Sequence, residues 1–265
     1  MQDLKISLVQ ARLKWEDAAF NLAHLAEMME GLAAGTDIIV LPEMFSTAFS
    51  MKPEQFAEPA DGPTFRWMQE QAKKHQAALS GSFMVRENGN YYNRMYFIRP
   101  DGSYEYYDKR HLFRMGNEQA HFSAGQKPTI FEFKGWKIQL LICYDLRFPV
   151  WAKNRYQAGN YAYDLTILVA NWPAVRSHVW KTLNSARAIE NQAYWVGVNR
   201  IGADGFGLDH SGDSNVWDAK GFPMLKQAPS EEFVETLSLS KTELDDFRSK
   251  FTVGLDWDNF EILDS

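Results

Sequence analysis

Short apolar runs recur along the chain, each rich in valine, isoleucine and leucine and each of a length that suits a buried strand. They lie at residues 5–11, 37–43, 137–144, 164–171 and 194–200. Segments with helical periodicity stand between several of these runs, at residues 17–34, 64–75, 150–158 and 175–191. The alternation predicts an α/β fold in which helices cover buried strands.

The middle of the chain has a different pattern. Between residues 78 and 113, aromatic-rich segments are joined by the turn pairs Asn88-Gly89 and Asp101-Gly102. Such pairs favour tight turns between antiparallel strands. We therefore expect a layered structure with mixed strand directions. No linker rich in proline, glycine or serine interrupts the chain, so residues 1–265 are predicted to form a single domain.

The charge balance disfavours several classes of partner. The formal net charge is −6, whereas a surface for nucleic acid or an anionic membrane needs a basic patch. The opening residues lack the apolar segment of a secretory signal, and no apolar stretch approaches the ~18 residues of a membrane span. We expect a cytoplasmic protein that acts on a small molecule and binds neither nucleic acid nor membrane.

The only cysteine, Cys143, stands at the end of the apolar run 137–144. A thiol at this place suits a nucleophile on a strand-to-turn elbow, where the backbone N–H of Tyr144 faces the carbonyl oxygen of a substrate. A buried free cysteine is also commonly inert. The nucleophilic interpretation therefore depends on a nearby base or cation, because a free thiol is mostly protonated at neutral pH.

Glu43 and Lys109 are the candidates for those groups. Glu43, like Cys143, stands at the end of an apolar run, and such run ends meet at the ligand-binding edge of an α/β sheet. Lys109 ends an aromatic hairpin segment, and an ammonium there would stabilise an oxyanion. Taken singly, Glu43 could be a turn carboxylate and Lys109 a solvated side chain. None of the six histidines follows an apolar strand, which disfavours a cysteine–histidine protease.

Three segments together carry a resemblance to a known family. LPEMF with Glu43, YDKRHLF with Lys109 and ICYDLRFP with Cys143 resemble, in this order, the signature segments of the nitrilase superfamily of carbon–nitrogen hydrolases. The resemblance implies a four-layer α-β-β-α sandwich with two mixed sheets, a Glu-Lys-Cys triad and no cofactor. It also implies a second catalytic glutamate, for which Glu118 in NEQAHFSAG holds the matching place.

The implied mechanism gives each residue a role. Glu43 takes the thiol proton as Cys143 attacks the amide carbon, and Lys109 and the Tyr144 N–H hold the oxyanion. Glu43 then protonates the leaving ammonia and activates the water that hydrolyses the thioester. Glu118 orients Lys109 or the substrate.

The segments DKRHLFRMGNE, CYDLRFPVW and ARAIENQAYWVGVNR are most similar to the bacterial ω-amidase branch. That branch implies hydrolysis of the terminal amide of 2-oxo dicarboxylic acid monoamides, such as 2-oxoglutaramate and 2-oxosuccinamate. A substrate of this kind needs a cation for its carboxylate. We expect Arg147 to supply it, ahead of Arg110 and Arg114. The alternative for Arg147 is an ion pair with Asp145 or Glu118.

Aromatic side chains near the motifs are candidate walls for a short substrate, although each could equally belong to the core. They are Phe45, Phe113, Tyr144 and Trp172.

Other functions stay open. A carbamoylase or a short aliphatic amidase of the same superfamily would keep the triad and change the pocket lining. A true nitrilase is disfavoured because ICYDLRFP lacks the cysteine-tryptophan-glutamate sequence of that branch. A catalytically silent binding module is the alternative from a different class.

We expect no metal or nucleotide cofactor. One cysteine and scattered histidines give no zinc-ligand spacing, and the glycines of residues 202–207 do not match a phosphate-binding fingerprint. The resemblance implies a homodimer. The aromatic C-terminal arm, residues 251–265, either packs across that interface or covers its own core.

Overall fold

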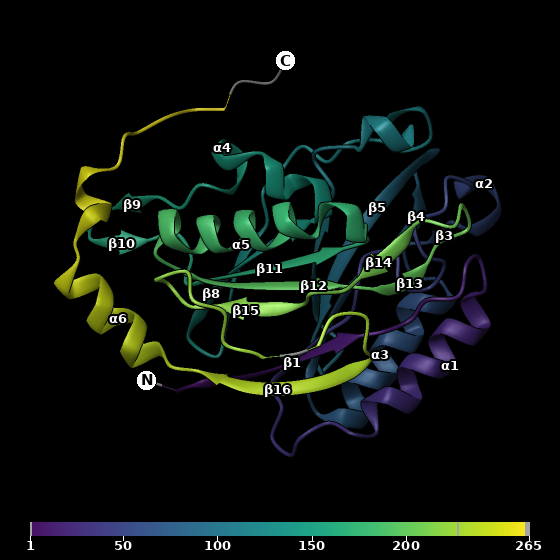
Figure 1. The fold of residues 1–265 in the computed structure, drawn as a ribbon, viewed down its shortest axis with the longest axis horizontal. Helices are drawn as coiled ribbons and strands as arrows, with labels where there is room; N and C mark the ends of the chain where they lie inside the picture. The colour runs from purple at the N-terminus through teal and green to yellow at the C-terminus, as the bar shows by residue number, and fades with distance from the viewer. Residues whose placement is uncertain (1, 227, 263–265) are drawn as a thin grey trace.

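The computed structural model describes residues 2–226 and 228–262, and it contains two large mixed β-sheets (Figure 1). The first has the order β16 (Phe233–Leu239), β1 (Leu4–Gln10), β2 (Ile38–Val40), β4 (Ala78–Glu87), β5 (Asn90–Ile98) and β6 (Tyr104–Asp108), with β3 (Glu58–Pro59) paired to β4. The second has the order β15 (Asn215–Trp217), β12 (Tyr194–Asn199), β11 (Leu165–Ala170), β8 (Trp136–Ile142) and β7 (Ile130–Phe133).

Each sheet has parallel pairs in its middle and antiparallel pairs at its flanks. Strand β2 is parallel to both β1 and β4, and β11 is parallel to both β8 and β12. The β4–β5 hairpin turns at Asn88-Gly89 and the β5–β6 hairpin at Asp101-Gly102, as the sequence predicts. Asn88 and Gly89 both have positive φ angles, which this tight turn requires.

Helices cover the outer faces of both sheets. Helices α1 (Ala18–Met29) and α3 (Pro63–His75) pack on the first sheet. Helix α5 (Ser177–Asn191) lies across the second sheet, as Figure 1 shows. Asp17 starts α1 by accepting a hydrogen bond from the Phe20 N–H, and a proline starts α3. The result is the four-layer α-β-β-α sandwich that the resemblance to the nitrilase superfamily implies.

The main hydrophobic core lies between the two sheets. Alternate residues of each strand face this layer and are fully buried, because strand side chains point to opposite faces in turn. They include Ile6, Leu8, Met95 and Phe97 from the first sheet and Leu140, Ile142, Ile167 and Val196 from the second. A second cluster joins the other face of the first sheet to its helices, with Ile39, Leu79, Leu25 and Met68 among its members.

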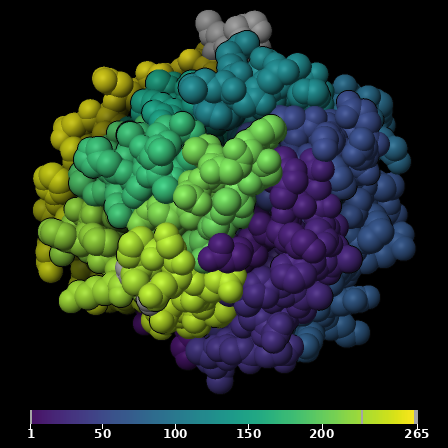
Figure 2. Space-filling view, turned by 45° about the vertical axis from the view of Figure 1, so that its right-hand side comes forward, coloured from purple at the N-terminus to yellow at the C-terminus, as the bar shows by residue number. Residues whose placement is uncertain are grey.

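Segments distant in sequence lie side by side on the surface. Figure 2 shows the purple N-terminal region next to green and yellow-green residues from the last third of the chain. Arg12 forms a parallel bridge with Ile201, and His24 lies 2.8 Å from Glu232. Strand β16 adds seven paired residues along β1, from Leu4↔Leu239 to Gln10↔Phe233. The chain therefore returns to its own N-terminal strand before α6 (Lys241–Lys250) begins.

One predicted helix is wrong. The segment 150–158 is helical only within α4 (Pro149–Ala152), and it then forms a small hairpin of β9 (Tyr156–Gln157) and β10 (Asn160–Tyr161). The side chain of Asn154 accepts from the N–H groups of Arg155 and Tyr163, which competes with helical hydrogen bonding. Ala158 and Gly159 have the positive φ angles of the turn.

Part of the C-terminal arm covers the chain's own surface. The arm continues from α6 through a short 3₁₀ turn, η5 (Val253–Asp256), and residues 263–265 lie outside the described residues. Trp257 packs edge-on against Tyr161 at 5.7 Å, with the Lys153 ammonium 3.4 Å from its ring centre. Among the residues that the structure describes, no helix is long and apolar enough to cross a membrane.

The remaining short elements surround one end of the sheets. They are α2 (Pro53–Phe56), β13 (Ile201–Ala203), β14 (Asp209–Ser211) and the 3₁₀ turns η1 (Arg114–Gly116), η2 (Glu118–Ala120), η3 (Cys143–Arg147) and η4 (Ala174–Arg176).

Candidate active site

Three residues that follow buried strands meet at one end of the core. Glu43 comes after β2, Cys143 directly after β8 and Asn171 directly after β11. The Asn171 N–H donates to Glu43 Oε2 at 2.7 Å, and the Cys143 thiol lies 3.9 Å from the Asn171 carbonyl oxygen. The two sheets therefore bring the predicted nucleophile and the predicted base together, although 100 residues separate them in sequence.

Lys109 joins this group from the end of β6. Its Nζ donates to Glu43 Oε1 at 2.8 Å and to Glu118 Oε2 at 2.9 Å. All three side chains are fully buried, with no solvent-exposed area. The side-chain amide of Asn93 also donates to Glu43 Oε1 at 2.8 Å. Two carboxylates thus flank one ammonium in a site without water access, and each oxygen's partner is fixed.

The charge of Lys109 is held by its neighbours. Burial alone would lower the pKa of this lysine, but the carboxylates of Glu118 and Glu43 outweigh burial and raise the pKa above its ordinary value. Lys109 is therefore a permanent cation at neutral pH. For Glu118, burial and the charge of Glu43 raise the pKa, against the opposing effect of Lys109.

Cys143 sits on a strained elbow with a protonated thiol. Its φ angle is +44°, in the left-handed region that residues other than glycine rarely adopt. Its side chain is only 9% exposed, and this exposed part reaches the pocket described below. Burial, and then the charge of Glu43, raise the pKa of the thiol well above its ordinary value. The charge of Lys109 acts in the opposite direction, but it does not outweigh burial and Glu43.

The backbone after Cys143 forms the short 3₁₀ turn η3. Tyr144 is the second residue of this turn, where backbone N–H groups have no partner within the helix. Such a group is free to donate to a bound substrate oxygen.

Asp145 holds the η3 turn in place through its hydrogen bonds. Its fully buried carboxylate accepts from the Ile142 N–H at 3.0 Å and from the Tyr107 hydroxyl at 2.8 Å. Its other oxygen accepts from the His111 N–H at 3.0 Å and lies 2.7 Å from His111 Nδ1. Tyr107 and His111 flank Lys109 in sequence. Asp145 therefore ties the segment that carries Lys109 to the elbow that carries Cys143.

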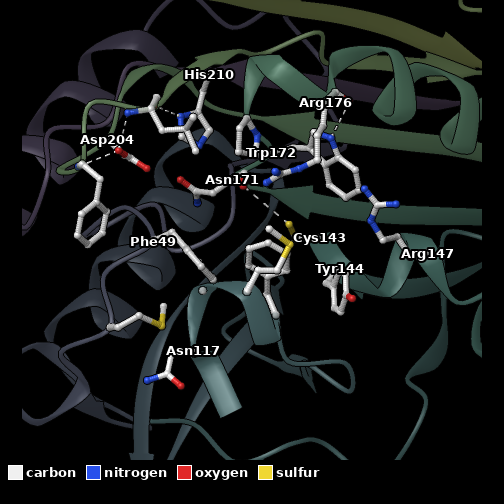
Figure 3. A pocket seen from close by; sticks show the side chains of 17 residues that line it. Phe49, Asn117, Cys143, Tyr144, Arg147, Asn171, Trp172, Arg176, Asp204 and His210 are labelled. Atoms are coloured by element: carbon white, nitrogen blue, oxygen red, sulfur yellow. Dashed lines mark hydrogen bonds between the residues drawn. The ribbon is translucent and has the colours of Figure 1, made fainter. Parts of the chain in front are cut away.

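A cavity of about 420 Å³ opens onto the thiol (Figure 3). Its lining includes four of the residues that the sequence singles out for substrate contact, namely Phe113, Tyr144, Arg147 and Trp172. Further lining residues come from the loop between β13 and β14 and from the region of η1, and include Phe206, Leu208, Met115 and Asn117.

Phe45 does not line the cavity, and its predicted role as a substrate wall is wrong. It is fully buried and packs with Trp67 at 5.8 Å and with Phe83 at 6.1 Å between ring centres. The Phe45 N–H donates to the Ser82 carbonyl, which directs the side chain into the core next to β4. A single residue, Met44, separates Phe45 from Glu43, and the chain turns there with a φ of +43°.

Arg147 lines the cavity and pairs with neither Asp145 nor Glu118. Those two carboxylates are occupied by the contacts described above. The Arg147 guanidinium instead stacks over the Trp172 ring, with its carbon 4.9 Å from the ring centre. Arg110 and Arg114 are not among the lining residues. The geometry thus favours Arg147 over both as the cation nearest a bound ligand.

Three asparagines hold the site together. The sequence pattern marked Asn171 as a strand-end candidate without giving it a role, and it did not single out the other two. Asn93 and Asn171 contact Glu43, and Asn199 at the end of β12 accepts from the Trp172 N–H at 2.7 Å. Asn171 and Asn199 directly follow or end apolar strands, which is the same signal that marks Cys143. Asn93 lies within β5 and could be recognised only as a fully buried polar residue in an aromatic strand.

Within the described part of the chain, no group of three or more histidine, cysteine, aspartate or glutamate side chains is arranged to hold a metal ion. The Lys109 ammonium is close enough to the thiol for its charge to lower the thiol pKa, against burial and Glu43.

Comparison with known proteins places this geometry in a family. The family model for carbon-nitrogen hydrolases matches residues 5–248. The chain belongs to the carbon–nitrogen hydrolase family. This confirms the resemblance to the nitrilase superfamily that the three sequence segments indicated.

Relatives in this family include proteins named for amide hydrolysis. "Omega-amidase YafV" of Escherichia coli is 41% identical over 99% of this chain and all of its own length. "2-oxoglutaramate amidase" of Bacillus subtilis is 33% identical over 75% of this chain and 77% of its own. The crystal structure of the carbon–nitrogen hydrolase superfamily protein XC1258 from Xanthomonas campestris, which holds an arsenic adduct in its active site, has a TM-score of 0.96 at 43% identity, covering 99% of this chain and 100% of that one.

Proposed function

We propose that this carbon–nitrogen hydrolase is an ω-amidase, which cleaves the terminal amide of 2-oxo dicarboxylic acid monoamides to the acid and ammonia. The observation that carries the proposal is the buried Glu43–Lys109–Glu118 network against Cys143, at the floor of a pocket that Arg147 lines. The two named relatives above support the choice of substrate.

In the proposed first half-reaction, Cys143 Sγ attacks the amide carbon and its proton passes to Glu43. The substrate oxygen takes up the negative charge and is held by the Lys109 ammonium and the Tyr144 N–H. Glu43 returns the proton to the amide nitrogen, the carbon–nitrogen bond breaks, and ammonia leaves. A thioester between the acyl group and Cys143 remains.

In the second half-reaction, water enters the place of ammonia and Glu43 takes one of its protons. The resulting nucleophile attacks the thioester carbon, the carbon–sulfur bond breaks, and the proton on Glu43 returns to the sulfur. Glu118 acts through Lys109: its carboxylate fixes the ammonium at 2.9 Å and balances its charge. In this scheme Arg147 binds the substrate carboxylate. Phe113 and Trp172 contact the carbon atoms of the substrate that lie between its carboxylate and its amide.

The direct test is ammonia release from 2-oxoglutaramate, 2-oxosuccinamate, an N-carbamoyl amino acid, a short aliphatic amide and a nitrile. We expect the two 2-oxo acid amides to give the highest kcat/KM. Release only from the carbamoyl compound or the aliphatic amide would replace the ω-amidase assignment with one of those activities. Release from none, with Cys143→Ala identical to wild type, would indicate a silent binding module.

We also propose that residues 1–265 act as a single domain that forms a cytoplasmic homodimer through the C-terminal arm. Phe251 and Leu255 of this arm are 57% and 66% exposed, although Trp257 packs on its own chain. Light scattering after size exclusion tests the interface. A dimer for wild type and a monomer for Phe251→Ser combined with Leu255→Ser is the expected result, and a monomeric wild type would reject it.

A further inference from the structure

Two arginines, not one, line the cavity on the Trp172 side. Arg147 comes from η3, and Arg176 comes from η4, the turn that leads into α5. Figure 3 shows both arginines on that side of the pocket and Asp204 on the opposite side. Of these two arginines, the sequence motifs singled out only Arg147.

Aromatic rings hold both guanidinium groups. Arg147 stacks over Trp172 at 4.9 Å, and Arg176 lies over Phe113 at 5.6 Å from the ring centre. The Trp172 Nε1–H donates to the Arg176 carbonyl oxygen at 2.9 Å. Trp172 therefore stacks with the side chain of Arg147 and also holds the backbone of Arg176. Stacking on a ring face leaves the N–H groups at the edge of a guanidinium free to bind a ligand.

No described carboxylate forms an ion pair with either arginine. The acidic residue of the lining, Asp204, uses Oδ1 to accept from the N–H groups of Phe206 and Leu208 at 2.8 and 2.9 Å. The lining histidine is neutral, because burial and then Arg200 lower the pKa of His210 to about 4. The Arg147–Arg176 wall thus carries two positive charges, neither of which is ion-paired with a described carboxylate.

We infer that Arg176 determines substrate specificity by selecting the charge of the substrate's head group. This inference rests on the proposed function. A monoamide of a dicarboxylic acid brings one carboxylate, which one guanidinium matches, and the second cation adds further attraction. An amino acid amide such as glutamine brings the same carboxylate together with an ammonium, which the second guanidinium repels. The enzyme would therefore accept monoanionic amides and reject zwitterionic ones.

Binding to the Cys143→Ala protein measures this selection without turnover. The ligands are 2-oxoglutaramate, glutaramate and L-glutamine, titrated by calorimetry. We expect glutaramate and 2-oxoglutaramate to bind at least about 30-fold more tightly than glutamine, as two like charges several ångströms apart in a half-buried site predict. Adding Arg176→Gln should weaken glutaramate binding about tenfold and glutamine binding by less than threefold.

Two matched variants separate charge from shape. Arg176→Lys keeps the cation and should keep most of the preference for glutaramate over glutamine. Arg114→Gln removes an exposed arginine that does not line the cavity, and it should leave the preference unchanged. A preference that Arg176→Gln leaves undiminished, or that Arg114→Gln lowers equally, would overturn the inference.

The same ligands and variants distinguish a failure of this inference from a failure of the proposed function. If wild type releases no ammonia from 2-oxoglutaramate but the charge preference is present and lowered in Arg176→Gln, the proposed function is wrong and the inference stands. If wild type hydrolyses 2-oxoglutaramate but Arg176→Gln leaves the preference unchanged, the inference alone is wrong. If Cys143→Ala binds none of the three amides, both are wrong.

Discussion

At the scale of single residues, proton placement is the central feature of the site. Lys109 stays charged because Glu43 and Glu118 raise its pKa against the effect of burial, while Cys143 stays neutral because burial and Glu43 raise its pKa. The resting site therefore stores no thiolate. In the proposed mechanism, proton transfer to Glu43 therefore accompanies the attack of Cys143 on the substrate.

Glu118→Gln tests the role of the second carboxylate. Glutamine keeps the shape but leaves Lys109 with one anionic partner, so the ammonium should be misplaced for the oxyanion. We expect kcat to fall about 100-fold with KM within threefold of wild type, and the free energy of unfolding to fall by about 3 kcal/mol, as for other broken buried pairs. Gln119→Ala, an exposed neighbour, is the control. Wild-type kcat in Glu118→Gln would refute a catalytic contribution from Glu118.

The raised pKa of the Cys143 thiol predicts how stability depends on alkaline pH. The folded protein keeps the thiol proton above the pKa of the unfolded thiol, about 8.5, so stability from this group is complete below that pH and declines above it. Between pH 7.5 and 9.5 the free energy of unfolding should fall about 1 kcal/mol more for wild type than for Cys143→Ala. Urea unfolding at the two pH values measures this difference, and equal slopes would mean that the folded thiol titrates normally.

At the scale of secondary-structure elements, the strand ends were predictable and the side-chain directions beyond them were not. Glu43 and Cys143 stand out because a polar residue ends an apolar run, and Asn171 carries the same signal. Phe45 was misplaced because the positive φ of Met44 turns the chain, which no sequence pattern reveals. The segment 150–158 was predicted as a helix because its periodicity does not register the hydrogen bonds of Asn154.

Phe45 and Phe113 form a matched pair for testing whether Phe45 belongs to the core and not to the cavity wall. Phe45→Ala should lower the free energy of unfolding by about 3–5 kcal/mol, as for other buried phenylalanines, while KM of the folded enzyme stays within twofold. Phe113→Ala removes a ring that lines the cavity and should raise KM about tenfold with less than about 1 kcal/mol of destabilisation. Urea unfolding measures the loss of stability, and steady-state kinetics measure KM. A raised KM for Phe45→Ala and an unchanged KM for Phe113→Ala would show that Phe45, and not Phe113, contacts the substrate.

Asp145→Asn tests the connection between η3 and the segment after β6. An asparagine cannot accept at both positions, so it would lose at least one of the contacts to Ile142, Tyr107 and His111. We expect kcat to fall 10- to 100-fold and thermal stability to drop, with ligand affinity of the Cys143→Ala background nearly unchanged. Asp61→Asn, at an exposed position, should match wild type. Unchanged kcat would show that the elbow is held without Asp145.

At the scale of the whole molecule, the site exists only where the two sheets meet. Glu43 and Lys109 come from the first sheet and Cys143 from the second, and Asn171 of the second sheet holds Glu43 through both its N–H and its side-chain amide. The alternation of apolar runs and helical segments predicted helices over buried strands, and the resemblance to the nitrilase superfamily implied the four layers. Strand β16 was not predicted, because it pairs with β1 across more than 220 residues and is half exposed.

In the proposed mechanism, Cys143 carries the acyl group during amide cleavage. Rapid mixing of the enzyme with 2-oxoglutaramate, followed by acid quenching and intact-mass spectrometry, tests this role. We expect a transient mass increase equal to the substrate less ammonia, located by peptide mapping on Cys143 and absent from Cys143→Ala. Ammonia release without any such adduct, or undiminished release by Cys143→Ala, would rule out Cys143 as the acyl carrier.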